Sequence, residues 1–326
     1  MKICSPEFYE MFECIASECP DTCCRHWQVV LDEEFIAKSK NLNLSDDSGS
    51  ILKRKVKGLG KNKHLVNCEN GDCPFLNSNL LCNLHTEVGN ENLPETCRRY
   101  PRFINNFGAY EERGISFSCP EGARLMKEKG IVLDVFDDEN VPMNYTDVDA
   151  ELFFFVRGAR NQIFDFLSSD KSDVDVKLNS IIRFSEKVQN SIDKRQYVNI
   201  EIDCSDNSKS EYLNNGLALK KAVALHCNNI FLNKEFLIKL CNSQIKEILD
   251  NEAFCLWTKY FIFKHLIMSA YDRKFLARAK AAVVSYFVIS SLGGNIYDNM
   301  QLYSKETEHN EKNMLRLLKF AEKAEI

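Results

Sequence analysis

The stretch CPDTCCRHWQVVLD, residues 19–32, sets the character of the N-terminal third of the chain because it places three cysteines within six positions. Two further cysteine-containing blocks follow it, CPFLNSNLLCNLHTEVGNENLPETCRRYPR at residues 73–102 and SCPEGARL at residues 118–125. Ten of the 14 cysteines lie in the first 119 residues, although 207 residues follow them. We therefore expect the chemistry of this protein to reside in its N-terminal third.

Cysteines drawn from several loops can hold an iron–sulfur cluster or zinc, because both bind thiolate and need about four ligands. The chain has no Cys-x2-Cys pair, which counts against a zinc ribbon. The pattern Cys-x3-Cys-x2-Cys is also absent, since Cys19-x3-Cys23 is followed by His26. The adjacent Cys23 and Cys24 cannot easily place both sulfurs on one metal. Spacing alone favours an iron–sulfur cluster over zinc, with a redox dithiol as the third interpretation.

The residues around the cysteines favour thiolate over thiol. Pro20, Pro94 and Pro120 each suit the first turn of a helix, where backbone N–H groups and the helix dipole lower the pKa of a nearby cysteine. This placement predicts helix N-termini at or near Cys19, Cys23, Cys97 and Cys119. Positive charge is added nearby by Arg25, Arg98, Arg99 and Arg102.

Composition excludes several classes of protein. The 326 residues carry a net charge of −5, and no basic run exceeds Lys53-Arg54-Lys55, so we expect neither a nucleic acid nor a membrane as partner. The N-terminus has no apolar region typical of a signal peptide, and no apolar stretch reaches the roughly 18 residues of a membrane span. The chain is therefore expected to be cytoplasmic, where dense cysteines bind metal or do redox chemistry more often than they form disulfides.

The pattern predicts a mainly α protein with two parts, an irregular Cys-rich metal-binding region at residues 1–130 and an all-helical bundle or array at residues 145–326. Short strand-like runs occur in the first part at 27–31, 64–67 and 115–118. Thr146 and Asp149 resemble a capping box that opens a helix with an apolar stripe through Leu167. Apolar periodicity predicts further helices at 176–192, 213–226, 233–249, 252–270, 272–292 and 305–324, with Gly293-Gly294 ending the fifth of these.

The aromatic and histidine residues of the helical part are expected to be structural. The runs 153–155 and 257–261 fit a packed core better than a cofactor site. His226 and His265 lie inside apolar helices and are expected to be buried and hydrogen-bonded, whereas His64 and His309 have no supporting pattern.

The three quoted blocks together resemble the bacterial flagellin lysine-N-methylase family of the FliB type, over about residues 8–126. They also share a core that resembles iron- or zinc-chelating proteins. The resemblance implies a cytoplasmic enzyme that transfers methyl from S-adenosylmethionine to lysine side chains of flagellin, with a 4Fe–4S cluster held by part of the cysteine set. The matching metal-ligand positions are Cys14, Cys19, Cys23, Cys24, Cys73, Cys82, Cys97 and Cys119. Cys4, Cys68 and the later cysteines lie outside the pattern.

Methyl transfer needs a neutral lysine amine, so a group that removes a proton is expected near the substrate. Tyr100 and Glu121 lie inside the matched blocks and are candidates, although a packed aromatic and a first-turn helix residue are the favoured roles. Arg98 and Arg102 are candidates for binding the carboxylate of the methyl donor, as is Arg99, but a basic rim around a thiolate cluster fits them equally.

The chain has no glycine-rich strand-to-helix turn of the kind that binds dinucleotides and S-adenosylmethionine in doubly wound folds. The donor is therefore expected at the Cys-rich core, or in a cleft between this core and the helices, unless a partner supplies part of the activity. Two other functions remain open at this point. One is a metal-chelating or assembly protein without transferase activity, and the other is a thiol redox sensor that uses Cys23 and Cys24.

Overall fold

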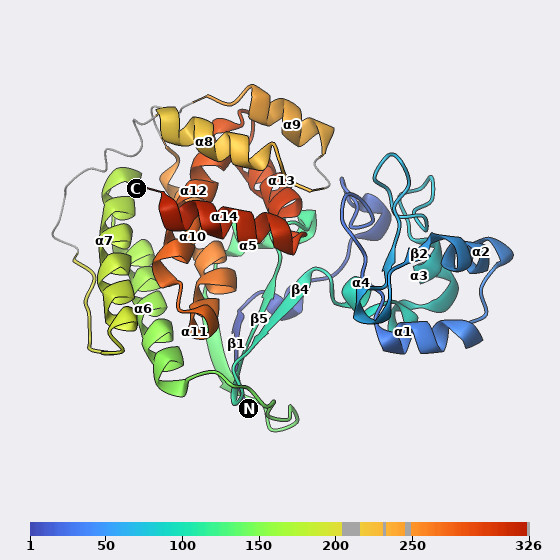
Figure 1. The fold of residues 1–326 in the computed structure, drawn as a ribbon, viewed down its shortest axis with the longest axis horizontal. Coiled ribbons are helices and arrows are strands. Elements are labelled where there is room, and N and C mark those ends of the chain that lie inside the picture. Colours follow the sequence, from blue (N-terminus) through green and yellow to red (C-terminus); the bar gives the residue numbers. More distant parts are fainter. Residues whose placement is uncertain (204–215, 231–232, 245–248, 325–326) are drawn as a thin grey trace.

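The computed structural model describes residues 1–203, 216–230, 233–244 and 249–324. Figure 1 shows a larger body, in which helices cover a small sheet, and beside it a smaller lobe drawn in blue and cyan. The lobe carries most of the cysteine blocks. The expectation of a mainly α fold, with a Cys-rich N-terminal part and a helical remainder, is confirmed.

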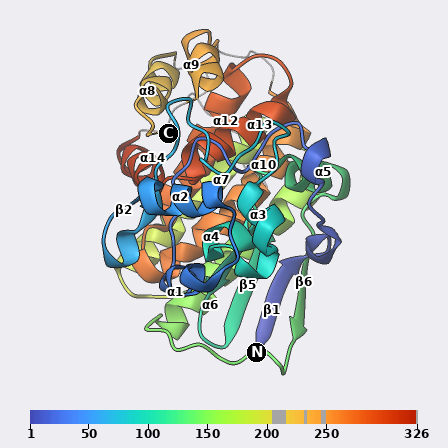
Figure 2. The same cartoon turned by 90° about the vertical axis from the view of Figure 1, so that its right-hand side faces the viewer.

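The body is built on a four-stranded sheet that joins distant parts of the chain. Its strands are β1 (Lys2–Pro6), β4 (Arg102–Asn106), β5 (Tyr110–Ile115) and β6 (Leu133–Asp137), in the order β4-β5-β1-β6. β1 runs parallel to β5, with Ile3 opposite Glu111, and antiparallel to β6, with Ile3 opposite Phe136. Figure 2 shows β5, β1 and β6 side by side below the lobe. Because the chain leaves the sheet after β1 and returns at β4, the lobe is an insertion between two strands of one sheet.

Helices from the rest of the chain pack on this sheet and on one another. They are α5 (Pro120–Lys129), α6 (Ala150–Ser169), α7 (Val174–Asp193), α8 (Gly216–His226), α9 (Lys234–Cys241), α10 (Asn251–His265), α11 (Ser269–Asp272), α12 (Phe275–Ser291), α13 (Ile296–Glu308) and α14 (Glu311–Lys323), with a 3-10 turn at Leu266–Met268. The large core of the body is continuous from the sheet to these helices, and α12 is buried along nearly its whole length.

A buried ion pair fastens the sheet to the helices. Arg160 of α6 donates to Glu112 of β5 at 2.7 Å, and both side chains are fully buried. A buried charge without a partner is costly, so this ion pair holds α6 at a fixed position relative to β5. Asn105 of β4 adds a second link by donating to the carbonyl of Lys264 on α10.

The lobe has short elements and a small core. It contains α1 (Glu33–Lys38), α2 (Asp46–Lys55), β2 (Val56–Lys57), β3 (His64–Leu65), α3 (Asn83–Val88) and α4 (Glu95–Arg99). 3-10 turns of the lobe lie at Ser39–Asn41, Gly60–Asn62 and Asn90–Asn92, and two more, Tyr9–Met11 and Ala16–Glu18, lie in the segment between β1 and the lobe. The buried apolar residues of the lobe are Val29, Leu31, Phe35, Leu65, Cys73, Phe75, Leu84 and Leu93.

The two hydrophobic cores are not divided at the boundary expected near residues 130–145. The smaller core lies within residues 29–93, whereas Cys4, Phe12, Phe117 and Ile131 all pack into the core of the body. Residues near both ends of the expected N-terminal region therefore pack with the helices. The division into 1–130 and 145–326 stays a prediction about independent folding.

The helix predictions hold where the apolar period is long and regular. α7 and α12 match the expected ranges closely, and α12 ends before Gly293 and Gly294, which have φ of +69° and +76°. The expected ranges 213–226 and 233–249 are described only in part, because 213–215 and 245–248 lie outside the described residues. The range 252–270 is helical throughout, with α10 followed by the 3-10 turn and α11.

Four local predictions are wrong. The cap of α6 is Asp149 alone, which accepts from the Leu152 N–H at 3.1 Å, so the helix does not open at Thr146. The expected helix 305–324 is two helices, because Asn310 caps α14 and interrupts the pattern. Phe154 is 63% exposed, so the run 153–155 is not all core. Of the strand-like runs, only His64–Leu65 and Ile115 lie in strands; residue 30 makes a single β-bridge to His64.

Gly122, in the first turn of α5, is packed too closely to accept a larger side chain. A Cβ added at Gly122 would lie 2.6 Å from Cγ2 of Ile115 and 2.9 Å from the carbonyl oxygen of Ser116. We expect Gly122→Ala to lower the free energy of unfolding by about 1–3 kcal/mol, measured by urea denaturation. Gly158→Ala is the control, since Gly158 lies within α6 with nothing within 4 Å of the added atom; it should be neutral or stabilising by up to about 1 kcal/mol. Equal effects of the two substitutions would contradict the packing described for α5.

Candidate metal centre and adjoining pocket

Backbone pairing brings the first two cysteine blocks together. The Cys73 N–H donates to the carbonyl of Cys24 at 2.8 Å, and Arg25 and Asp72 form an antiparallel bridge. The same two residues form an ion pair through their side chains. Further along the second block, a bridge between residue 76 and Cys82 folds the chain back on itself. Residues about fifty positions apart thus place their thiols on one side of the lobe.

Cys24 lies at the centre of the gathered thiols. Its thiol makes polar contacts with the thiols of Cys23, Cys73 and Cys82. The contact with Cys24 lowers the pKa of Cys82 to about 7, although burial opposes this, and backbone N–H groups at the start of α3 lower it further. The pKa of Cys73 is also lowered by Cys24, whereas the pKa of Cys24 itself is raised because its proton is shared among its neighbours.

Asp32 places the third block beside the first two. Its carboxylate accepts from the Phe35 N–H at 2.8 Å, which caps α1, and from the Glu95 N–H at 2.7 Å, which holds the start of α4. Cys97 lies on α4, and burial raises its pKa well above the ordinary value, with Cys73 and Cys82 as the nearest thiol charges. The lobe therefore brings together Cys23, Cys24, Cys73, Cys82 and Cys97.

The other three candidate cysteines, Cys14, Cys19 and Cys119, form a second group on the side of the body, and Cys19 also interacts with Cys23 of the first group. Cys119 is the N-cap residue of α5, with Pro120 in the first turn, as expected. Burial raises the pKa of Cys119 to about 12, although N–H groups of α5 oppose this, and its thiol neighbours are Cys19 and Cys14. The expected helix after Pro20 is absent, because Cys19 instead ends the 3-10 turn Ala16–Glu18.

The chemistry of the gathered residues fits a thiolate-bound metal or cluster. Five thiols converge from three blocks of chain, and N–H groups directed at the sulfurs of Cys73 and Cys82 are typical of bound thiolates. Within the described ranges, no three His, Cys, Asp or Glu side chains already stand in a coordination geometry. The cysteines of those ranges are all free thiols, so no disulfide competes for them. The group has the donors for a metal, and these thiols would have to close around it.

A pocket of about 340 Å³ lies next to the thiols, where the lobe meets the body. Its lining from the lobe includes Trp27, and its lining from the body includes Lys264 of α10 and His309, which follows α13. The full lining is Trp27, Glu95, Thr96, Arg99, Tyr100, Pro101, Arg102, Phe103, Ser116, Lys264 and His309. Two residues of the lining are linked directly to the thiols. Thr96 precedes Cys97, and the indole N–H of Trp27 donates to the carbonyl of Cys23.

Three aromatic rings close one side of this pocket. The ring centroids of Trp27 and His309 are 4.8 Å apart, and Tyr100 lies 5.4 Å from each of them. The hydroxyl of Ser118 is within hydrogen-bond distance of both the Tyr100 hydroxyl and Nε2 of His309. Burial lowers the pKa of His309 to about 3, so the imidazole is neutral near pH 7, and burial raises the pKa of Tyr100, so its hydroxyl keeps its proton.

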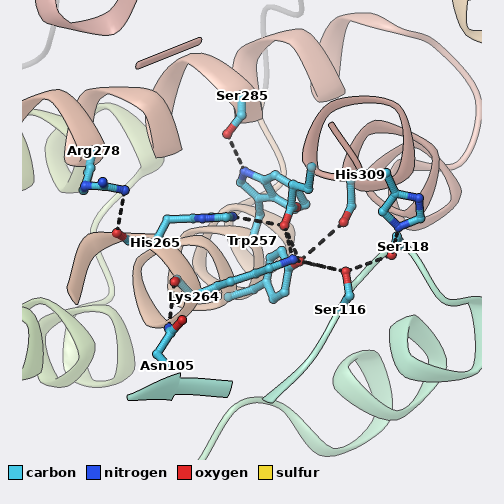
Figure 3. Close-up of polar contacts among 12 residues, drawn as sticks. Asn105, Ser116, Ser118, Trp257, Lys264, His265, Arg278, Ser285 and His309 are labelled. Carbon is cyan, nitrogen blue, oxygen red and sulfur yellow. Dashed lines mark hydrogen bonds and ion pairs between the residues drawn. The ribbon is translucent and has the colours of Figure 1, made fainter. Parts of the chain in front are cut away.

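A buried polar network forms the floor of the pocket (Figure 3). Lys264 donates to Glu308 at 2.5 Å and to the hydroxyls of Tyr260 and Ser116. Burial opposes both charges, yet the ion pair lowers the pKa of Glu308 well below its usual range and raises the pKa of Lys264. His265 also hydrogen-bonds Glu308, so this histidine is satisfied, as expected; His226 is as well, with Tyr303 as its partner. Lys264 therefore brings a fixed positive charge to the pocket.

Of the catalytic and donor-binding candidates from the sequence, some line the pocket and others lie outside it. Tyr100 and Arg102 line the pocket, and Arg102 is held by the Phe12 carbonyl and ring. Arg98 lies instead beside Asp32, away from the pocket. Glu121 pairs with Arg124 on α5, and that pairing lowers the pKa of Glu121. Glu121 thus lies in the first turn of α5 and Tyr100 lies at the pocket, while a proton-accepting role for either residue stays a prediction.

The sequence did not indicate two important residues of the pocket, His309 and Lys264. His309 lies in the break between α13 and α14, a break that the apolar pattern conceals. Lys264 occupies an ordinary position in the last turn of a largely apolar helix. An isolated residue of this kind carries no local signal, because its partners come from distant parts of the chain.

Lys305 of α13 anchors the first cysteine block to the body. Its ammonium group donates to Asp21 at 2.5 Å and to the carbonyl of Thr22 at 2.9 Å, and its side chain is 3% exposed. Gln301 donates to Asp21 and to the carbonyl of Ser118. Burial would raise the pKa of Asp21, but the pair with Lys305 lowers it.

Comparison with known proteins agrees with the position of the site. Residues 13–115 match a family model described as "Putative zinc- or iron-chelating domain", which includes all five gathered thiols. Over 150 residues the chain is 27% identical to the lysine-N-methylase of Salmonella typhimurium (strain LT2), and equally to that of Salmonella choleraesuis. Each match covers 41% of this chain but only 37% of the relative.

A third relative is the flagellar biosynthetic protein FliU of Salmonella muenchen, which is 29% identical over 125 residues. This match covers 36% of the chain and 73% of that protein.

No solved structure matches the chain. Across the described ranges, no helix has the length and apolar character to cross a membrane. The Cys-rich segment is thus similar to a metal-chelating domain. More particularly, the resemblance to proteins named lysine-N-methylase is confirmed at modest identity.

The anchor at Lys305 predicts a stability effect. We expect Lys305→Met to lower the free energy of unfolding by about 1–3 kcal/mol, because the Asp21 carboxylate would lose its charged partner and retain neutral donors such as Gln301. Lys312→Met on α14 is the control, since Lys312 is exposed, and it should change the free energy by less than about 0.5 kcal/mol. Urea denaturation measures both variants. A Lys305→Met protein as stable as the control would show that this contact is dispensable.

Proposed function

We propose that this protein is a lysine N-methyltransferase that carries a metal centre and acts on flagellin with S-adenosylmethionine as donor. The centre proposed is an iron–sulfur cluster of the 4Fe–4S type, with zinc as the alternative, in a protein of the bacterial cytoplasm. The observation that carries the proposal is that relatives named lysine-N-methylase match this chain, and that the Cys-rich segment contains converging thiols beside a pocket. The name of the third relative supports the link to the flagellum.

The proposed metal ligands come from the five thiols gathered in the lobe. Cys73 and Cys82 receive backbone N–H groups and lie against Cys24, while Cys97 is brought in by α4. Cys14, Cys19 and Cys119 lie in the neighbouring group, which interacts with Cys23 through Cys19, so they stay candidate ligands beside the five gathered thiols. Bound metal would cross-link three blocks of chain in a lobe that has only a small apolar core.

The pocket supplies surroundings that suit transfer to an amine. A lysine ammonium with a pKa near 10.4 in water must lose its proton before it attacks the methyl group. The charge of Arg102, which is held by a carbonyl, opposes a second cation nearby and so favours the neutral amine, whereas the charge of Lys264 is balanced by Glu308. The bound donor supplies the methyl group; the residues of this chain position the two reactants and hold water away from them.

A second function is favoured by the family description. A chelating or assembly protein would bind metal through the same thiols without transferring methyl groups. The two functions differ in one measurement, because the proposed transferase incorporates radiolabelled methyl groups from S-adenosylmethionine into flagellin and a chelating protein does not. Mass spectrometry of the product would identify lysine as the modified residue. Metal-replete protein that gives no methylated flagellin would contradict the transferase.

The metal content of protein purified without oxygen tests the centre itself. We expect a brown protein with near-equal iron and sulfide, whereas a colourless protein that contains zinc would contradict the cluster. Cys73→Ser and Cys97→Ser should each lose bound iron, because both thiols belong to the gathered set. Cys241→Ser is the control and should keep its iron, since Cys241 is exposed at the end of α9. Full iron content in all three variants would show that the ligand assignment is wrong.

A further inference from the structure

We infer that the pocket between the lobe and the body is the binding site for S-adenosylmethionine, with Arg99 and Glu95 recognising its α-amino-acid group. The inference rests on the proposed function, because it assigns the methyl donor of that reaction to a place in the fold. The pocket volume of about 340 Å³ suits a ligand of nucleoside size.

Arg99 and Glu95 form an ion pair on one face of α4, at the pocket. Their charged groups are 2.8 Å apart, and their side chains are 56% and 44% exposed. Exposed ion pairs of this kind contribute little to stability, so a ligand can replace each partner at low cost. An α-amino-acid group carries the complementary charges, a carboxylate for Arg99 and an ammonium for Glu95. Arginine also binds carboxylates through two parallel hydrogen bonds.

Trp27 and Tyr100 offer ring faces to the remainder of the ligand. Both rings line the pocket, and they come from different blocks of the lobe. Aromatic faces attract planar bases by stacking and attract cations through their ring electrons. Beyond its amino-acid end, S-adenosylmethionine has a sulfonium, a ribose and an adenine. The pocket therefore presents partners for the amino-acid group, the sulfonium and the adenine.

His309 provides an independent indication that a ligand belongs here. Its Nε2 is within hydrogen-bond distance of Ser118 at 2.8 Å, but its Nδ1 is buried without a hydrogen-bond partner. A buried polar atom left unpaired is costly, and native structures contain few of them. Since the ring lines the pocket, a polar group of a bound ligand can supply the missing partner.

The chain has no glycine-rich phosphate-binding turn, and the proposed site does not need one. The site uses side chains of α4, a loop of the lobe and the start of the break after α13, rather than the edge of a parallel sheet. A donor bound here would lie against Trp27 and Thr96, which link the pocket to Cys23 and Cys97. This is the cleft between the Cys-rich core and the helices considered from the sequence.

Binding of S-adenosylhomocysteine to the full-length, metal-replete protein tests the site by calorimetry, without any turnover. This probe keeps the amino-acid group, the ribose and the adenine, and it lacks the transferable methyl group and with it the sulfonium charge. We expect Arg99→Gln to weaken binding about tenfold or more through loss of a charge-assisted contact. His309→Phe, which keeps the aromatic packing and removes both nitrogens, should also weaken binding at least severalfold. Metal content and the unfolding midpoint are measured for each variant to confirm that it is folded.

Arg98→Gln is the matched control, because Arg98 is exposed on the same helix but lies outside the pocket. Its affinity should equal that of the unmodified protein. Unchanged affinity in both Arg99→Gln and His309→Phe would overturn the site while leaving the proposed function intact. A raised KM for flagellin in these variants, with unchanged affinity for S-adenosylhomocysteine, would assign the pocket to the protein substrate instead. Failure of the unmodified protein to bind S-adenosylhomocysteine would overturn the proposed donor, and the site with it.

Discussion

Lys305, almost fully buried on α13, donates to a carboxylate and a carbonyl in the segment that leads to the first gathered thiols. A buried ammonium without an acceptor is unfavourable, so the helix and this segment are held at one separation. Trp27 follows a few residues later and reaches His309, which follows Lys305 by about one helical turn. The contacts of Lys305 with Asp21 and Thr22 and the contact of His309 with Trp27 both join residues 21–27 to residues 305–309, and the pocket lies beside them.

The lobe has little apolar packing to stabilise it, and the thiols bear on this point. Short helices, two-residue strands and eight buried apolar side chains leave little hydrophobic surface to offset the conformational entropy of residues 29–97. Hydrogen bonds such as those accepted by Asp32 define where α1 and α4 lie, but each contributes only modestly to stability. The small core and the converging cysteines agree with the proposed metal centre, whose ligands would take the place of apolar packing.

Sequence reasoning succeeded where the determining interactions are local. The 3.6-residue period of α7 and α12 and the cap before α5 are written in consecutive residues, and the cysteine blocks showed where the thiols would gather. It missed the sheet because β1 pairs with β5, more than a hundred residues away, and it missed the break before Asn310 because the apolar pattern continues across it. The pocket residues His309 and Lys264 could not be found either, since their role arises only when the lobe and the body meet.

The order of the strands has a consequence for how the chain matures during synthesis. β1 is made first, yet its two neighbours, β5 and β6, follow the entire Cys-rich insertion. Chains emerge from the ribosome at about 5–20 residues per second, so β1 waits for seconds as an unpaired strand while the lobe is already complete. The lobe is thus free to bind the proposed metal on the nascent chain, before the sheet closes and before α13 arrives to cover the first cysteine block.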